Sequence, residues 1–421
     1  MDHFLYRDGK LFAEDVSVAE IAAEVGTPFY LYSTATLERH FKLFDDALED
    51  MEHLVCYAMK AASNQAILKT LAACGAGMDV VSGGEYARAK AAGVSGDKIV
   101  FSGVGKTVDE IEAALSGGIR QFNVESEPEM EAINMVALRL GVVAPITIRV
   151  NPDVDAKTHA KIATGKSENK FGIPISRARD VYAHAASLKG LKIVGIDVHI
   201  GSQLTELAPF ELAYIKVAEL TETLRADGHE IKRLDLGGGL GIPYTRSNEA
   251  PPLPVEYGAM IKKTLGHLGC EIEIEPGRLI AGNAGIMVSQ VIYVKKGEDR
   301  EFMIVDAAMN DLIRPAMYEA HHDIVALNEA EAGVEQVSYD IVGPICESGD
   351  TFAKSRVMPP VRAGDMIAFR SAGAYGAVMS SEYNSRPLIP EVLVKDGEFA
   401  IIRKRPTVQE MIERDQVPSW F

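Results

Sequence analysis

Short apolar segments alternate with amphipathic stretches from about residue 53 to residue 280, and this alternation constrains the fold more than any other feature. The short segments predict strands, and the stretches between them carry apolar residues at helical spacing. Strands that alternate with helices predict a parallel sheet with right-handed crossovers. The expected strands span residues 53–59, 77–81, 98–102, 121–124, 146–151, 192–199, 233–236 and 271–275.

Eight such units in this length of chain favour a closed (β/α)8 barrel of the TIM type. A doubly wound open sheet is the alternative, although it usually has fewer strands. The pattern changes after residue 285, where short strands are separated by turn residues and predict a mostly β domain, a sandwich or a barrel. Those strands are expected at residues 288–294, 302–306, 338–342, 366–369, 391–394 and 399–402.

The fold class expected is therefore α/β plus β, with three segments in the chain. Residues 1–30 contain a hairpin-like stretch with an Asp8-Gly9 turn and are expected to pack with the β domain. Residues 31–285 form the barrel and residues 286–421 the C-terminal β domain. A length of 421 residues agrees with more than one domain.

Composition argues against several classes of partner. The net charge of −17 makes nucleic acid an unsuitable partner, because phosphate backbones require basic surfaces. No apolar run reaches the ~20 residues that span a bilayer, and the N-terminus resembles no signal peptide. Neither a disulfide framework nor a metal site is expected, and a reducing cytoplasm fits, because the cysteines are scattered without a CxxC pair: Cys56, Cys74, Cys270 and Cys346.

Chemically capable residues gather at the ends of the predicted strands, where barrel enzymes place their active sites. Lys60 follows the first strand and Glu275 ends the last. A lysine that can form a Schiff base and a carboxylate that can hold a pyridinium nitrogen suit a pyridoxal phosphate enzyme. Taken singly, each residue could instead be a solvated lysine or a barrel-mouth ion pair. The strand ends carry Lys60, Asp79, Ser102, Glu125, Arg149, Asn151, His199, Ser202, Gly237–Gly239, Glu275, Gly277 and Arg278.

A glycine run, Gly237–Gly241, follows the seventh strand and could close backbone N–H groups on a phosphate, with a helix start adding a favourable dipole. A tight turn is the alternative, but Gly277 and Arg278 after the next strand strengthen the phosphate interpretation. A Walker motif at Gly105-Lys-Thr is excluded, because Val100 occupies the position of its first glycine.

The β domain carries a second set of candidates. Cys346 lies in the turn-rich stretch Gly343-Pro-Ile-Cys-Glu-Ser-Gly-Asp350, where a thiol could donate a proton rather than serve as a buried structural group. Tyr375 lies in a second glycine-rich turn. Arg314, four residues before Tyr318, could clamp a carboxylate with two hydrogen bonds or form a surface ion pair.

These motifs together resemble the diaminopimelate decarboxylases, from about residue 25 to residue 390. The resemblance rests on Tyr57-Ala-Met-Lys60-Ala, Met78-Asp-Val-Val-Ser-Gly-Gly-Glu85, His199-Ile-Gly-Ser202, Leu236-Gly-Gly-Gly239, Glu275-Pro-Gly-Arg278, Gly343–Asp350 and Gly373-Ala-Tyr375. It implies a fold-type III enzyme, with an alanine-racemase-like barrel, a C-terminal β domain and pyridoxal 5′-phosphate as cofactor. It also implies a cytoplasmic homodimer with shared active sites.

The resemblance also implies a role for each residue. Lys60 would be the Schiff-base lysine, His199 would stack on the cofactor ring, and Glu275 would pair with the ring nitrogen. Cys346 would donate a proton across the dimer interface, accompanied by Glu347. The remaining cofactor-binding residues would be Asp79, Ser202, Gly239, Gly277, Arg278 and Tyr375. Substrate would contact Arg278, Arg314, Tyr318, Glu347 and Tyr375.

The implied reaction is decarboxylation of meso-2,6-diaminopimelate to L-lysine and carbon dioxide, the last step of lysine biosynthesis. Arg314 and Arg278 suit a distal carboxylate and Glu347 suits the distal ammonium, whereas related decarboxylases of other basic amino acids bind that end with acids. An amino-acid racemase on the same barrel is an alternative, but such relatives generally place an arginine where Glu275 stands. A non-catalytic regulatory homologue is another, but such proteins tend to lose Lys60 or Cys346.

Overall fold

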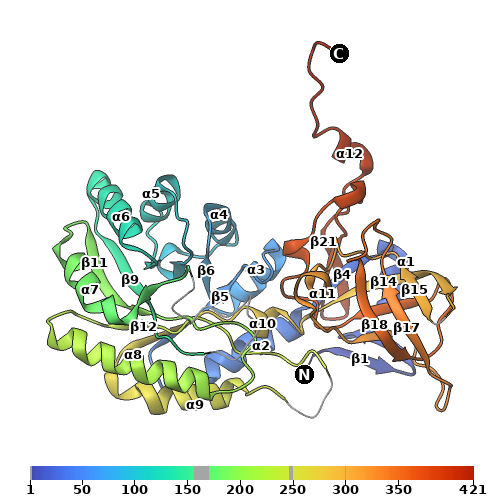
Figure 1. The fold of residues 1–421 in the computed structure, drawn as a ribbon, viewed down its shortest axis with the longest axis horizontal. Helices are drawn as coiled ribbons and strands as arrows, with labels where there is room; N and C mark the ends of the chain where they lie inside the picture. Colours follow the sequence, from blue (N-terminus) through green and yellow to red (C-terminus); the bar gives the residue numbers. More distant parts are fainter. Residues whose placement is uncertain (1, 156–169, 246–249, 299) are drawn as a thin grey trace. The chain divides into compact units, whose positions relative to one another are not determined.

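The computed structural model describes residues 2–155, 170–245, 250–298 and 300–421 (Figure 1). The chain divides into two compact units. The first, here called the β unit, comprises Met1–Leu37, Tyr244–Ser247 and Ala281–Phe421. The second, the barrel unit, comprises Glu38–Pro243 and Asn248–Ile280.

The barrel unit contains the predicted closed sheet of eight parallel strands. Each strand pairs with the next, and the last pairs with the first, which closes the barrel. The expected fold class is therefore confirmed. The strands are β5 (His53–Ala58), β6 (Gly77–Val80), β7 (Ile99–Phe101), β8 (Gln121–Val124), β9 (Ala144–Asn151), β11 (Leu191–Asp197), β12 (Arg233–Asp235) and β13 (Glu271–Ile274). A two-residue strand, β10 (Ile173–Pro174), adds to β9.

Helices form the outer layer around these strands (Figure 1). They are α2 (Thr34–Ala47), α3 (Gln65–Ala73), α4 (Gly83–Ala91), α5 (Val108–Ser116), α6 (Glu127–Leu140), α7 (Ala178–Ser187), α8 (Ala208–Ala226), α9 (Pro254–Leu265) and α10 (Arg278–Ala281). Among the described residues, no helix has both the length and the apolar composition that a membrane crossing requires.

Polar N-cap residues begin the helices that follow the loops at the carboxyl ends of the strands. Asn64, Ser82, Thr107 and Ser126 each accept a backbone N–H from the first turn of the helix that follows. A side-chain cap of this kind contributes about 1 kcal/mol. The loops that carry Lys60, Ser102 and the neighbouring strand-end residues are therefore anchored on both sides.

The interior of the barrel is unusually polar. Branched apolar residues dominate most barrel interiors. Here Gln121, Asn123, Asp235 and Glu273 are all fully buried. They alternate in sequence with outward-facing apolar residues such as Phe122 and Leu234, which are also buried, beneath the helices. The interior therefore supports the strand-end residues with hydrogen bonds as well as with packing.

The β unit is built around a nine-stranded sheet. Its main path runs β18-β17-β15-β14-β4-β20-β21, and β19 pairs with both β14 and β16. The strands are β4 (Phe29–Ser33), β14 (Gly285–Lys296), β15 (Glu301–Val305), β16 (Ile324–Ala326), β17 (Val337–Val342), β18 (Thr351–Met358), β19 (Met366–Phe369), β20 (Glu391–Lys395) and β21 (Glu398–Arg403). Two short helices, α11 (Arg314–Tyr318) and α12 (Val408–Ile412), also belong to this unit.

The N-terminal residues contribute more to the β unit than the hairpin alone suggested. The hairpin pairs β1 (Phe4–Arg7) with β2 (Lys10–Ala13), and β3 (Val16–Ser17) and α1 (Val18–Val25) follow. Strand β4 then inserts between β14 and β20 and is buried throughout. The sequence did not predict β4, β16 or β18; the partners of β4 and β16 are distant along the chain, whereas β18 pairs with the preceding strand β17.

Candidate active site

Lys60 lies just beyond the end of β5, at the carboxyl edge of the barrel. Its Nζ lies 2.7 Å from Oδ2 of Asp79, which is fully buried at the neighbouring strand β6. The Tyr57 hydroxyl donates to the Ala62 carbonyl at 3.0 Å and ties the loop back to the strand. The amine is therefore held on a short, anchored loop and pairs with a buried carboxylate.

Glu275 follows β13 directly and is buried. Its Oε1 accepts hydrogen bonds from the Ser102 hydroxyl at 3.0 Å and from the Asn123 amide at 3.1 Å. Burial raises the pKa of Glu275 well above its usual value, the carboxylates of Asp235 and Asp79 raise it further, and Lys60 opposes them. A cationic ligand at this position would favour the ionised carboxylate.

His199 lies two residues beyond β11 and has a defined tautomer. The backbone N–H of Gly238 donates to its Nδ1 at 3.2 Å, so the ring proton resides on Nε2. Burial lowers the pKa of His199 well below its usual value, and the positive charges of Arg149 and Lys60 lower it further. The site therefore contains a neutral, flat imidazole.

A corner rich in hydrogen-bond donors lies beside His199. The Arg278 guanidinium donates to the Ser202 hydroxyl at 3.0 Å from Nη2. The nearby glycine run packs closely: a Cβ on Gly239, whose φ is 123°, would lie 2.4 Å from the Gly201 carbonyl oxygen. A guanidinium, a hydroxyl and tightly packed glycines suit a phosphate.

The helix start expected after the glycine run is absent among the described residues 242–245 and 250–253, because α9 begins only at Pro254. The glycine run is thus a loop, and a helix dipole makes no contribution there. Gly277 is also tightly placed, since a Cβ would lie 3.0 Å from the Ala58 carbonyl oxygen. It lets the chain after β13 pass close to the end of β5.

Glu125 and Arg149, two strand-end residues to which the sequence assigned no role, form a buried ion pair at 2.8 Å. Glu125 also accepts the backbone N–H groups of Gly103 at 3.2 Å and Gly172 at 3.0 Å. Arg149 Nη2 lies 3.4 Å from the His199 carbonyl oxygen. This pair therefore links three strand-end loops of the barrel to one another.

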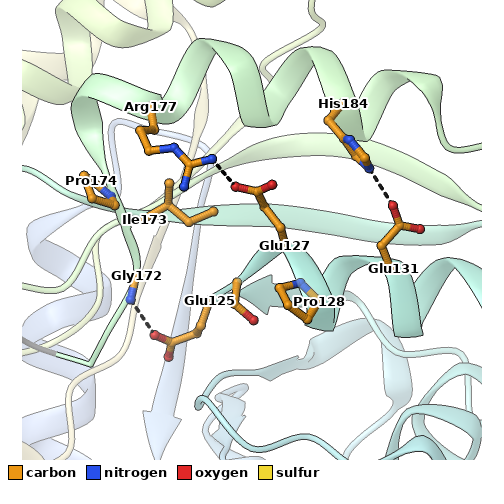
Figure 2. Close-up of a pocket in the computed structure, with 10 residues that line it drawn as sticks. Glu125, Glu127, Pro128, Glu131, Gly172, Ile173, Pro174, Arg177 and His184 are labelled. Atoms are coloured by element: carbon orange, nitrogen blue, oxygen red, sulfur yellow. Dashed lines mark hydrogen bonds and ion pairs between the residues drawn. The ribbon is translucent and has the colours of Figure 1, made fainter.

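Glu125 also lines a pocket of about 620 Å³, together with residues of α6 and α7 (Figure 2). Its wall pairs Arg177 with Glu127 at 2.5 Å and His184 with Glu131 at 2.6 Å. None of its lining residues is predicted to hold a cofactor or substrate, and glutamates outnumber the basic residues among them.

The second set of candidates lies in the β unit, and Arg314 is the buried member of this set. Arg314 opens α11 and is buried, with Nη1 2.9 Å from Nε2 of His322 and the guanidinium 4.5 Å from the centre of the Tyr244 ring. The Nδ1 of His322 lies 2.9 Å from the Arg370 carbonyl oxygen, which requires the proton on Nδ1 and leaves Nε2 as an acceptor for Arg314. The arginine is therefore held in one orientation.

Cys346 lies exposed in the loop between β17 and β18, and its backbone N–H donates to the Asn384 side chain at 3.1 Å. The same loop is closed by Asp350, whose buried carboxylate accepts the N–H groups of Ile345 and Met309, both at 2.7 Å. A Cβ on Gly343 would lie 2.3 Å from this carboxylate, so the loop requires glycine there. Asp350 thus holds the thiol loop in shape.

The other predicted residues of the β unit are Glu347, Tyr318 and Tyr375. Glu347 is exposed beside Cys346, and Tyr318 is the last residue of α11. Tyr375 lies in the turn after β19 with a φ of 56°, a left-handed conformation that is uncommon for tyrosine. Such backbone strain is often found at functional sites.

The structure thus brings the predicted barrel residues together at one edge of the barrel and places the remaining predicted residues in the β unit. Three supporting residues were missed: Asn123, His322 and Asp350. Asn123 had a recognisable signal, because it and Gln121 are polar residues that alternate with apolar residues along the buried strand β8. His322 and Asp350 act through contacts that no local pattern reveals.

A family model described as "Pyridoxal-dependent decarboxylase, pyridoxal binding domain" matches residues 34–282. That range covers the barrel strands and the strand-end residues described above. The fold is therefore that of a pyridoxal-dependent decarboxylase.

Individual relatives show to which family of pyridoxal-dependent decarboxylases the chain is similar. The chain is 50% identical over 413 residues to the diaminopimelate decarboxylase of Vibrio cholerae, with 98% of each chain covered. It is 51% identical over 411 residues to that of Pseudomonas aeruginosa, again with 98% of each covered. A crystal structure of diaminopimelate decarboxylase from Helicobacter pylori complexed with L-lysine matches with a TM-score of 0.90 and 41% identity, covering 94% of this chain and 98% of that one. The chain belongs to the diaminopimelate decarboxylase family.

Proposed function

We propose that this chain decarboxylates meso-2,6-diaminopimelate to L-lysine and carbon dioxide, the last step of lysine biosynthesis. The observation that carries the proposal is the 50% identity over almost the whole chain to an enzyme named for this substrate. The positions of Lys60 and Glu275, after the first and last strands of the barrel, support it.

The strand-end residues fit pyridoxal 5′-phosphate, the cofactor of this family. Lys60 would bind it covalently, Glu275 would pair with the ring nitrogen, and the neutral imidazole of His199 would stack on the ring. Asp79 would orient the amine of Lys60. The phosphate would be held by Ser202, Gly239, Gly277, Arg278 and Tyr375. The bound cofactor supplies an electron sink for the bond that breaks at Cα.

Residues of the β unit would select the substrate. Arg314, oriented by His322, would clamp the distal carboxylate, with Arg278, Tyr318 and Tyr375 as further contacts. Glu347 would hold the distal ammonium. A site built around a guanidinium for a distal carboxylate disfavours ornithine, arginine and lysine, which lack that group.

The remaining chemistry falls to protein groups. Lys60 would give up its place to the substrate amine, and the substrate-binding residues would orient the carboxylate that leaves. The cofactor would supply the sink for the electron pair of the bond between Cα and the carboxyl carbon, and Glu275 would stabilise that charge. The thiol of Cys346 would give its proton to Cα, which completes the product.

We further propose a cytoplasmic homodimer with shared sites, in which Cys346 and Glu347 of one subunit complete the site of the other. Cys346 is exposed on a loop of the β unit, where a second subunit could meet it. None of the four cysteines forms a disulfide, which suits a reducing compartment. The net charge of −17 makes nucleic acid an unsuitable partner, because phosphate backbones require basic surfaces.

The holoenzyme is expected to release L-lysine and carbon dioxide from meso-2,6-diaminopimelate in a one-to-one ratio. We expect kcat/KM for this substrate to exceed that for L-ornithine or L-arginine by about 10³-fold or more, because a buried guanidinium would be left without its carboxylate. Chiral chromatography and carbon dioxide release measure both products. Comparable turnover of ornithine would contradict the proposed specificity, and a stereochemically inverted product without carbon dioxide would indicate a racemase.

Arg314→Lys is expected to raise KM for diaminopimelate by about ten- to a hundredfold, because an ammonium cannot reproduce the two parallel hydrogen bonds of a guanidinium. The inhibition constant of an analogue that lacks the distal carboxylate, such as 1,5-diaminopentane, should change little, whereas that of L-lysine, which keeps this carboxylate, should rise with KM. Steady-state kinetics and inhibition by the two compounds give these values.

Arg370→Lys is the matched control, because Arg370 is another buried arginine of the β unit. It pairs with Asp2 at 2.7 Å. This variant should lower the melting temperature without changing the ratio of KM to the inhibition constant of 1,5-diaminopentane. Equal losses for substrate and 1,5-diaminopentane in Arg314→Lys would mean that Arg314 is a structural residue.

A further inference from the structure

The polar interior of the barrel forms a directed chain of hydrogen bonds that ends on Glu275. Arg233 at the amino end of β12 donates to the side-chain oxygen of Gln121 at 3.3 Å, which turns the Gln121 NH₂ group toward the interior. That NH₂ group donates to Oδ1 of Asn123 at 3.1 Å. The Thr147 hydroxyl lies 2.7 Å from the same oxygen. The amide of Asn123 is therefore fixed with its nitrogen toward the carboxyl edge of the barrel.

The Asn123 nitrogen lies between two buried carboxylates. Its distances are 3.1 Å to Oε1 of Glu275, 2.9 Å to Oδ2 of Asp235 and 3.0 Å to the Ser102 hydroxyl oxygen. Ser102 donates its own hydrogen to Glu275, so its oxygen is also an acceptor, and the two hydrogens of Asn123 are shared among this oxygen and the two carboxylates. One amide thus contacts both acids.

This shared contact matters because the two carboxylates destabilise each other. Asp235 is fully buried, and its Oδ1 accepts the Gly237 N–H at 3.0 Å. Burial raises the pKa of Glu275 and the charge of Asp235 raises it further, while hydrogen bonds donated to a carboxylate favour its ionised form. Without the amide, the shared environment would favour a protonated Glu275 that cannot pair with a cationic ring nitrogen.

We propose that Asn123 is a positioning residue for this reaction, which holds the Glu275 carboxylate by Oε1 in the orientation and ionisation state that a pyridinium partner requires. The inference rests on the proposed function, because it needs Glu275 to be the partner of the ring nitrogen. Asn123 acts through Glu275 and makes no contact with substrate.

The test compares three variants with wild type. Asn123→Asp keeps the shape of the side chain but replaces the donor with a third acid. Asp235→Asn removes one acid and keeps the Asn123 donor. The exchange variant, N123D with D235N, restores both the net charge of the interior and an amide–carboxylate hydrogen bond between positions 123 and 235. It leaves an acid in place of the donor beside Glu275.

We expect N123D to lower kcat by a hundredfold or more, with a smaller change in KM, and to lower the melting temperature of the cofactor-free protein. The exchange variant should recover the melting temperature but keep kcat within about threefold of N123D and well below that of D235N. Adding N123D to Glu275→Gln should cost little beyond Glu275→Gln alone, because both changes act on one carboxylate. Calorimetry, cofactor titration by absorbance and steady-state kinetics supply the values.

Recovery of both kcat and melting temperature in the exchange variant would overturn the proposal, because Asn123 would then only neutralise the interior. If N123D fails to fold, the exchange variant and D235N still decide: equal kcat values overturn the proposal and a lower value in the exchange variant supports it. An unimpaired Glu275→Gln would overturn the assignment of Glu275 as well, which separates a failure of the proposed function from a failure of Asn123 alone.

Discussion

Replacing Lys60 with alanine is expected to abolish covalent retention of the cofactor and to lower turnover by about 10³-fold or more. The reason is that Lys60 would supply the amine that binds the cofactor covalently. Asp79 would also lose the cation that its Oδ2 contacts at 2.7 Å. Borohydride treatment followed by mass spectrometry of the intact chain measures the retained cofactor, and lysine release measures turnover.

Lys106→Met is the matched control for this experiment. Lys106 also lies in a strand-end loop of the barrel, but its side chain is buried and its Nζ contacts Glu129 at 2.7 Å and the Asn123 carbonyl oxygen at 2.8 Å. This variant should lose stability while borohydride still fixes the cofactor. Fixation of the cofactor in Lys60→Ala, or its loss only in Lys106→Met, would show that Lys60 is the wrong lysine.

Mixing two inactive variants, Lys60→Ala and Cys346→Ala, is expected to restore activity if each site combines residues from both subunits. Random exchange gives about half heterodimers, and two-fold symmetry places both intact residues in one of the two sites of each heterodimer. Recovery should therefore approach roughly a quarter of the wild-type activity. Lysine release after subunit exchange is the measurement.

The exchange itself needs an independent control. Differently tagged subunits, purified on both tags in succession, show whether heterodimers formed. A mixture of Lys60→Ala with Glu275→Gln should stay inactive, because both residues belong to the barrel unit of one chain. Confirmed heterodimers of Lys60→Ala and Cys346→Ala without activity would mean that each site is built from a single chain.

Two kinds of local sequence pattern predicted much of the fold and of the candidate site. Alternation of apolar residues predicted all eight barrel strands, from His53–Ala58 to Glu271–Ile274, within two residues at each end. The (β/α)8 architecture then identified the strand ends as the place to look for chemistry, and Lys60 and Glu275 were found there. Both inferences use only the period of a strand or a helix and the geometry of one fold class.

These local patterns could not predict contacts between residues that are distant along the chain. Strand β4 (Phe29–Ser33) has no local signal that assigns it to a sheet with β14 and β20, because its partners lie more than 250 residues further along the chain. The helix start expected after Gly237–Gly241 was wrong, since a glycine run by itself does not decide whether a loop or a helix follows.

The sequence by itself determined the fold class, the family and the residue types at the strand ends, because these depend on local periodicity and on short motifs. Only the tertiary structure decided how the ends are held: the orientation of the Asn123 amide, the tautomers of His199 and His322, and the closure of the Cys346 loop by Asp350. Each of these features depends on hydrogen bonds between residues that are not adjacent in the chain. Those hydrogen bonds can form only once β5 and β13 have closed the barrel and the sheet of the β unit has assembled.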